Sequence, residues 1–169
     1  MSRKNPQMSD VPDHTHLPAV AEKSNDALLS HLPLTSVLDA MPDAVGVYDS
    51  AGRLVFANGV ARRLLGTQQD PAFLNHPPRQ RSHAVRLRAS DGVPLAHDQS
   101  HVKRLLRGET ITSEHPIELL FTNLHGRDHY VSITGAPIAD AQGTLLGAIA
   151  ISRDITEQRR RDLTQADLI

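Results

Sequence analysis

Histidine is the residue type best able to do chemistry in this sequence, and two histidines lie four positions apart in AHDQSHVKRLLRGE, residues 96–109. The segment predicts a helix over residues 99–107, which Asp98 begins and whose apolar stripe is Val102, Leu105 and Leu106. A neutral imidazole binds haem iron, so His97, just before this helix, is a candidate cofactor ligand. The alternative is that His97 is an exposed or helix-capping residue and that His101 lies on the surface.

Other patterns of catalytic or metal-binding residues are missing from the sequence. There is no Cys, which excludes disulfides and thiolate chemistry. His14 and His16 form a His-x-His pair, but two imidazoles alone make a weak metal site, so we predict no bound metal. We find no Ser-His-Asp order, no pair of clustered carboxylates and no phosphate-binding glycine motif. We therefore expect that this chain alone is not an enzyme.

Length and charge narrow the class of protein. The chain has 169 residues, the length of one ordinary domain with tails, and a net charge of −1. A balanced charge disfavours a nucleic-acid-binding surface. No apolar run reaches the roughly 18 residues that a membrane-spanning helix needs, and residues 1–16 lack the apolar stretch of a secretory signal. We expect a cytoplasmic protein whose partners include neither nucleic acid nor a membrane.

Changes in composition divide the chain into four parts. Residues 1–26 are rich in Pro, Ser, Asp, Asn and Lys, which predicts a disordered tail. Apolar residues return in residues 27–33, a predicted helical extension, and residues 34–155 form the predicted domain. Residues 156–169 indicate a charged helix that continues to the end of the sequence.

Alternating apolar residues and turn signals predict five strands in this domain, at residues 44–48, 53–57, 110–122, 129–137 and 145–153. The alternation of Val85, Leu87 and Ala89 also resembles a short edge strand. Short helices are expected over residues 36–41 and between Asn58, a typical N-cap, and Gly66, a typical C-cap. Antiparallel strands with helices inserted after the second one indicate an α+β fold in which helices cover one face of a sheet.

Three segments carry a resemblance to a known family. Residues 38–66, LDAMPDAVGVYDSAGRLVFANGVARRLLG, and residues 136–161, APIADAQGTLLGAIAISRDITEQRRR, are similar to the two ends of a PAS domain, a sensor module of bacterial signalling proteins. Residues 91–109, DGVPLAHDQSHVKRLLRGE, resemble a common subgroup. The resemblance spans residues 34–161. It implies a five-stranded antiparallel sheet with helices between strands 2 and 3, a pocket between sheet and helices, and a role in signal transduction.

The expected pocket-facing residues follow from alternation along the strands. They are Val45, Val47, Leu64, Leu105, Ile117, Val131, Ile133, Ile149 and Ile151. A shift of one residue in a strand would move its side chains to the other face of the sheet. The bulkier residues expected to set the pocket size are Tyr48, Phe56 and Tyr130. The alternative is that all these side chains fill a dry core and that the domain serves only for dimerisation.

The sequence Asp154, Ile155 and Thr156 lies where the last strand meets the C-terminal helix. The resemblance implies that this junction passes the signal outward. We expect Thr156 to cap the helix through its hydroxyl and Asp154 to pair with a basic side chain, and the alternative is a purely structural cap. The helix has apolar residues near one face, which favours a stub that pairs in a homodimer. The expected partners are a second copy or another signalling protein, and a small-molecule ligand.

The resemblance also bears on cofactors. Because photoreceptive flavin domains of this family react through a Cys, the lack of Cys excludes a Cys-adduct flavin. In oxygen-sensing haem members, the iron-binding His lies one helix before a Gly-Glu type of turn, and His97 stands in this way before Gly108. However, Ile117 stands where such sensors carry an Arg, and His115 is the candidate sixth ligand. We favour an ordinary role for His97 and keep haem as the alternative.

The sequence therefore predicts a PAS sensor or interaction module that binds a small ligand or a partner protein and relays the change through its C-terminal helix. Two alternatives stay open. In one, the chain is the sensor portion of a histidine kinase or another multidomain signalling enzyme. In the other, it is a haem-based gas or redox sensor that uses His97.

Overall fold

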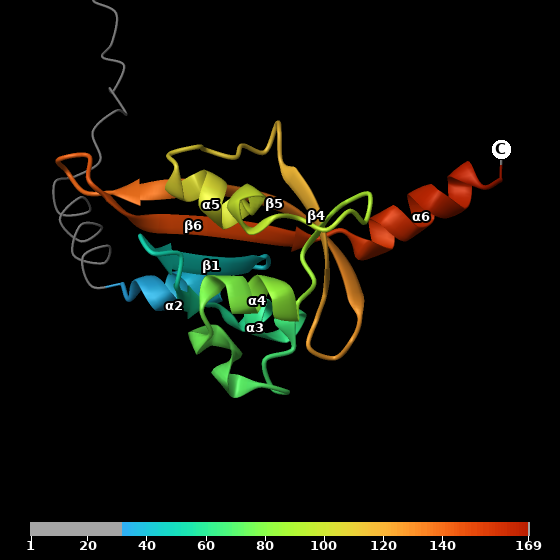
Figure 1. Cartoon of the computed structure of the whole chain (residues 1–169), viewed down its shortest axis with the longest axis horizontal. Helices are drawn as coiled ribbons and strands as arrows, with labels where there is room; N and C mark the ends of the chain where they lie inside the picture. Colours follow the sequence, from blue (N-terminus) through green and yellow to red (C-terminus); the bar gives the residue numbers. More distant parts are fainter. Residues whose placement is uncertain (1–31, 169) are drawn as a thin grey trace, which may run out of the picture. The chain divides into compact units, whose positions relative to one another are not determined.

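A six-stranded antiparallel sheet forms the centre of the part of the chain that the structure, a computed structural model, describes, residues 32–168 (Figure 1). The strand order is β2-β1-β6-β5-β4-β3. The bounds are β1 Ala44–Asp49, β2 Leu54–Ala57, β3 Arg88–Ala89, β4 Ile117–Thr122, β5 Asp128–Ala139 and β6 Leu145–Asp154. The predicted α+β fold is confirmed. The sheet has one strand more than the five expected, because the two-residue β3 pairs with β4 at the edge. The predicted tail, residues 1–26, and residues 27–31 of the predicted extension lie outside the described residues.

Helices cover one face of this sheet (Figure 1). The α-helices are α2 Leu34–Asp39, α3 Gly59–Leu65, α4 Pro78–Ala84, α5 His101–Leu106 and α6 Thr156–Ala166, with the short 3-10 helices η1 Pro71–Asn75 and η2 His97–Gln99. Between β2 and β4, the chain forms α3, η1, α4, η2 and α5, as the expected insertion after the second strand requires. None of the helices in residues 32–168 combines the length and the apolar character that crossing a bilayer requires.

Asn58 fixes the start of α3, as the sequence predicted. Its Oδ1 accepts hydrogen bonds from the backbone N–H of Ala61 at 2.9 Å and of Val45 at 3.0 Å. Its Nδ2 donates to the backbone carbonyls of Leu38 and Asp43. This buried side chain therefore caps α3 and also joins it to β1 and α2. Both its oxygen and its nitrogen have hydrogen-bond partners, as a buried polar group requires. Gly66, with a φ of 77°, ends the helix in the left-handed conformation that glycine favours.

Two predicted elements are shorter than expected. The helix predicted over residues 99–107 is divided into η2 and α5, because Ser100 Oγ accepts a hydrogen bond from the Lys103 N–H and caps a new helix there. Asp98 lies in η2 and not at the start of α5. The strand predicted over residues 110–122 begins only at Ile117, directly after Pro116, which has no N–H to donate to a ladder.

Small residues determine how closely α5 approaches the sheet. Leu105 of α5 is fully buried, and Ala148 and Ala150 beneath the helices are buried as well. A Cβ at Gly135 would lie 2.9 Å from Leu105 Cδ1 and 2.5 Å from the backbone oxygen of Ile149. Close packing at this end therefore depends on a residue without a side chain. Beneath α3 and α4, several small residues leave the space between helices and sheet unfilled, and this space is a cavity.

Candidate functional site

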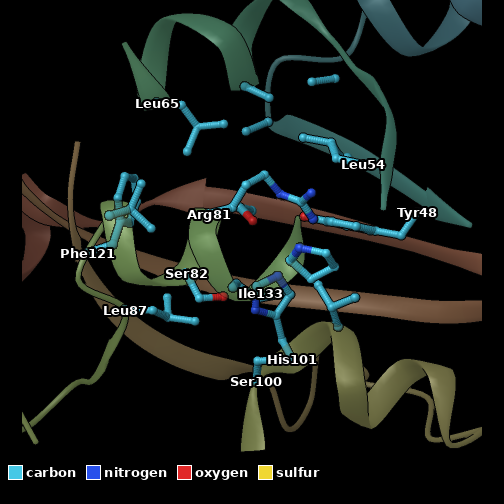
Figure 2. Close-up of a pocket in the computed structure, with 18 of the residues that line it drawn as sticks. Tyr48, Leu54, Leu65, Arg81, Ser82, Leu87, Ser100, His101, Phe121 and Ile133 are labelled. Carbon is cyan, nitrogen blue, oxygen red and sulfur yellow. The ribbon is translucent and has the colours of Figure 1, made fainter. Parts of the chain in front are cut away.

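The cavity lies between β1, β4 and β5 of the sheet and the helices α3, α4 and α5, and its volume is about 140 Å³. Figure 2 shows side chains from all these parts around one space. The space remains open because many residues of its wall have a small side chain or none: Ala44, Gly46, Gly52, Ala57, Ala61, Ser82, Ser100 and Ser152. The cavity therefore arises from side-chain sizes on several elements that are far apart in the sequence.

The structure brings some of the expected pocket residues together and separates others. Leu64, Val131 and Ile133 line the cavity. Leu105 and Ile117 belong to the apolar core beside it without lining it. The remaining four lie on the opposite face of the sheet, where Val45 pairs with Ile151 and Val47 with Ile149.

In β1 and β6, the assignment is thus shifted by one residue. Gly46 and Tyr48 of β1 line the cavity in place of Val45 and Val47. The physical reason is that the central strands are apolar on both sides, so alternation does not identify the cavity side. Of the bulky residues, Tyr48 lines the cavity, whereas Phe56 and Tyr130 do not.

A buried Arg81 is the main polar feature of the cavity. Only 8% of its surface is exposed. Its Nη1 donates to the backbone carbonyl of His76 at 2.7 Å and its Nη2 to that of Gly52 at 2.9 Å, which joins α4 to the β1–β2 turn. The guanidinium also lies 5.9 Å from the centre of the Tyr48 ring, within range of a cation–π contact. Burial lowers the pKa of Arg81, which remains charged because guanidinium is so basic.

Tyr48 and His101 lie next to each other in the cavity wall (Figure 2). Their rings meet edge to face with centroids 6.4 Å apart. Burial lowers the pKa of His101 to about 4, so this imidazole is neutral at pH 7. Burial also raises the pKa of Tyr48, against an opposing effect of the Arg81 charge, so the phenol keeps its proton. The sequence suggested that His101 lies on the surface; the structure instead places it at the cavity.

His97 also lines the cavity, from η2. Its pKa is lowered by burial and by the nearby positive charges, of which Lys103 has the largest effect. The volume of the cavity that His97 lines is about 140 Å³. His115, the candidate sixth ligand, is exposed and does not line the cavity. The role of His97 as an iron ligand stays a prediction.

A second polar cluster connects the cavity to the start of α6 through His129. Phe121 lines the cavity, and its ring stacks on that of His129 with centroids 5.6 Å apart. Asn123 fixes the hydrogen bonding of this imidazole. Because its Oδ1 accepts from the N–H groups of His125 and Arg127, its Nδ2 is the donor to His129 Nε2. His129 Nδ1 therefore carries the proton and donates to Asp154 Oδ2 at 3.1 Å.

Asp154 then holds the first residues of α6. Its Oδ1 accepts hydrogen bonds from the backbone N–H and the hydroxyl of Thr156. Burial raises the pKa of Asp154, but the hydrogen bonds from Thr156 and His129 outweigh this and lower it below the usual value. Thr156 does not cap the helix through its hydroxyl as expected. That oxygen instead accepts from the N–H of Tyr130 on β5.

One further contact fixes α6 to the sheet. Arg159 forms an ion pair with Glu118 of β4, and its guanidinium lies 5.9 Å from the centre of the Tyr130 ring. Beyond this point, α6 extends away from the sheet (Figure 1), and Leu163 is exposed on it. Sequence analysis did not identify Arg81, Phe121 or His129 as site residues.

Comparisons with known proteins agree with this fold. A family model described as the PAS fold matches residues 38–160. The chain is 28% identical over 137 residues to the alginate biosynthesis sensor protein KinB of Pseudomonas aeruginosa, over 80% of this chain and 20% of that protein. It therefore spans about a fifth of the length of this relative.

Two solved structures show the same fold at low identity. An RNA-binding light-oxygen-voltage receptor matches with a TM-score of 0.58 and 23% identity, over 96% of this chain and 42% of that one. The PAS domain of an HTR-like protein from Haloarcula marismortui matches with a TM-score of 0.51 and 19% identity, over 82% of this chain and 100% of that one. Because the family model covers most of the sequence and the described sheet and helices agree with it, this chain belongs to the PAS family.

Proposed function

We propose that this chain is a sensor module that binds a small molecule in the cavity and relays the binding event to α6. The observation that carries the proposal is the series of direct contacts from Phe121 in the cavity wall, through His129, to Asp154, the last residue of β6, which accepts hydrogen bonds from the first residue of α6. The similarity to a sensor protein supports a sensing role. The proposal includes binding and no catalytic step.

The relay requires two arrangements of the Phe121 side chain that a ligand distinguishes. A ligand shifts such an equilibrium only as far as its affinities for the two states differ. A molecule that moves the Phe121 ring changes the stacking on His129, because the two rings are in contact. A change in that stacking changes the length of the hydrogen bond from His129 to Asp154. Asp154 in turn holds the first turn of α6 through its hydrogen bond with Thr156. Ligand binding is thus converted into the stability of that turn.

A substitution that fills the cavity tests this relay without a known ligand. Ser82 lies in the cavity wall with its hydroxyl directed inward (Figure 2), so Ser82→Leu adds apolar atoms to the space. Ser113→Leu, at an exposed position outside the cavity, is the matched control. We expect amide hydrogen exchange in residues 157–160 to change in Ser82→Leu and to stay at the wild-type rate in the control. Equal exchange rates in all three proteins would contradict the relay.

The output partner is proposed on the exposed part of α6. Leu163 is 56% exposed, and Leu168 beyond the helix is 82% exposed. Pairing with α6 of a second copy would cover such residues, as in a short coiled coil. The alternative that the chain acts as the sensor portion of a histidine kinase is also supported by the similarity to KinB. Light scattering of wild type and Leu163→Glu tests the first arrangement, since a homodimer through α6 would dissociate in the variant.

A further inference from the structure

We propose that the cavity binds a small organic acid whose carboxylate contacts the Arg81 guanidinium and whose apolar part fills the remaining space. The proposal rests on the proposed function, in which the cavity is the ligand site, and it names the chemical class of that ligand. It is drawn from the charge, the size and the polar groups of the cavity.

The charged side chains that line the cavity are all of one sign. Among the described residues that line it, only Arg81 and Lys103 carry a permanent charge, and none is acidic. No carboxylate within residues 32–168 forms an ion pair with Arg81. The negative charge of Asp49 acts on Arg81 from nearby, but the Asp49 carboxylate forms its ion pair with Arg53, at 2.7 Å. The cavity therefore presents a positive charge without a compensating anion of its own.

A buried cation of this kind favours an anionic ligand. Desolvation of a charged group costs several kcal/mol, and an opposite charge in good geometry offsets this cost. Two backbone carbonyls occupy only part of the guanidinium's five N–H donors. A carboxylate accepts two parallel N–H groups from guanidinium, which makes this one of the stronger hydrogen-bonded contacts in proteins. Lys103 adds a second positive charge in the wall.

The size and lining of the cavity limit the rest of the ligand. A cavity of about 150 Å³ lined by apolar side chains accommodates benzene, so about 140 Å³ suits a molecule of roughly six to ten non-hydrogen atoms. Leu65, Phe121 and Leu87 lie on the side of the space away from Tyr48 (Figure 2). Arg81 extends toward Tyr48 on the other side. This division matches a molecule with one charged end and one apolar end.

Neutral polar groups accompany the charge. Nδ1 of His97 and Nδ1 of His101 are buried and have no hydrogen-bond partner within residues 32–168. A buried nitrogen without a partner costs about 1–3 kcal/mol, so such atoms mark places where protein contacts are incomplete. The Tyr48 phenol keeps its proton and is available as a donor in the same wall. Because these groups are neutral, they can orient a ligand through hydrogen bonds while Arg81 pairs with the ligand's negative charge.

Pairs of acids and amides of the same shape test the proposal. Isothermal calorimetry would compare benzoate with benzamide and butyrate with butyramide, each at up to about 10 mM, a range that detects millimolar dissociation constants. We expect at least one acid to bind about tenfold or more tightly than its amide, because only the acid pairs with guanidinium. Arg81→Met should remove this preference, whereas Arg79→Met, an exposed cation of α4 that does not line the cavity, should retain it.

The outcomes separate this proposal from the proposed function. Equal affinity for acid and amide, or binding of neither acid, overturns the organic-acid proposal. If Arg81→Met does not fold, two other results decide the organic-acid proposal. One is the ratio of the wild-type affinities for acid and amide, and the other is whether Lys103→Met lowers that ratio. In the same samples, hydrogen exchange of residues 157–160 reports on the relay. If an acid binds and this exchange stays unchanged, the result supports the ligand class and contradicts the relay. If an amide binds and the exchange changes, the result supports the relay and contradicts the ligand class.

Discussion

His101 makes the folding stability of this domain depend on pH in a predictable way. Its ring lies in the cavity wall against Tyr48, and burial lowers its pKa from 6.5 to about 4. Between these two values, the unfolded chain binds a proton at His101 and the folded chain does not. Since the free energy of unfolding rises with pH wherever the unfolded state binds more protons, acidification below pH 6.5 destabilises the fold. The effect is complete once the pH passes below about 4.

The size of the effect follows from the shift. Each pH unit inside this window removes about 1.4 kcal/mol from the free energy of unfolding. Between pH 7 and pH 5, His101 alone therefore costs about 2 kcal/mol, and at pH 4 close to 3 kcal/mol. His97 acts in the same direction, because its pKa is also lowered. The lowered pKa values of Asp49, Asp128 and Asp154 act only at lower pH, near and below the normal carboxylate value of 3.8.

Urea unfolding, followed by circular dichroism because the chain has no Trp, measures this dependence. The wild type is compared with His101→Gln from pH 5 to pH 7.5, and the difference between the two isolates His101 from His97 and the carboxylates. His115→Gln, at an exposed position, is the control. We expect the variant to lose about 2 kcal/mol less than the wild type between pH 7 and pH 5. Parallel curves for wild type and His101→Gln would refute the buried, neutral imidazole.

Three further substitutions have defined outcomes. Asn58→Asp keeps the N-cap oxygen but places a carboxylate against two backbone carbonyls, so we expect a loss of about 2 kcal/mol or more in urea unfolding, although Asp is normally as good a cap as Asn. Gly135→Ala forces β6 or α5 to move, because its Cβ would lie 2.5 Å from a backbone oxygen; we expect a loss of about 1–3 kcal/mol by the same assay. Asp154→Asn removes the charge that holds Thr156, and we expect faster amide exchange in the first turn of α6.

The order of elements was predictable from the sequence because local signals set it. Asn58 and Gly66 mark the two ends of α3, and both act as their types predict. The turn residues between strands likewise place the hairpins. The start of β4 depended on Pro116, whose effect on the ladder the apolar pattern did not show. Local chemistry therefore gave the elements and left some of their boundaries uncertain by several residues.

The cavity was predictable only in part, because it depends on which face of each strand the helices cover. Val131 and Ile133 alternate with polar residues, so their side was evident, and His129 lies two positions before Val131 on the same face. That spacing was the one signal that could have identified His129. In β1, both faces are apolar, and Gly46 gave no sign that the cavity lies on its side. The burial of Arg81 depends on the turn at Gly52 and on His76, which no local pattern connects.

Coupling between the cavity and α6 is the central claim, and a double-mutant cycle measures it most directly. The four proteins are wild type, Ser82→Leu, His129→Ala and the double variant, and the quantity is the free energy of opening of the first turn of α6 from amide exchange. If the cavity acts on α6 through His129, the effects of the two changes do not add, and we expect an interaction energy of about 0.5–2 kcal/mol. Additive effects, with an interaction energy near zero, would contradict the relay.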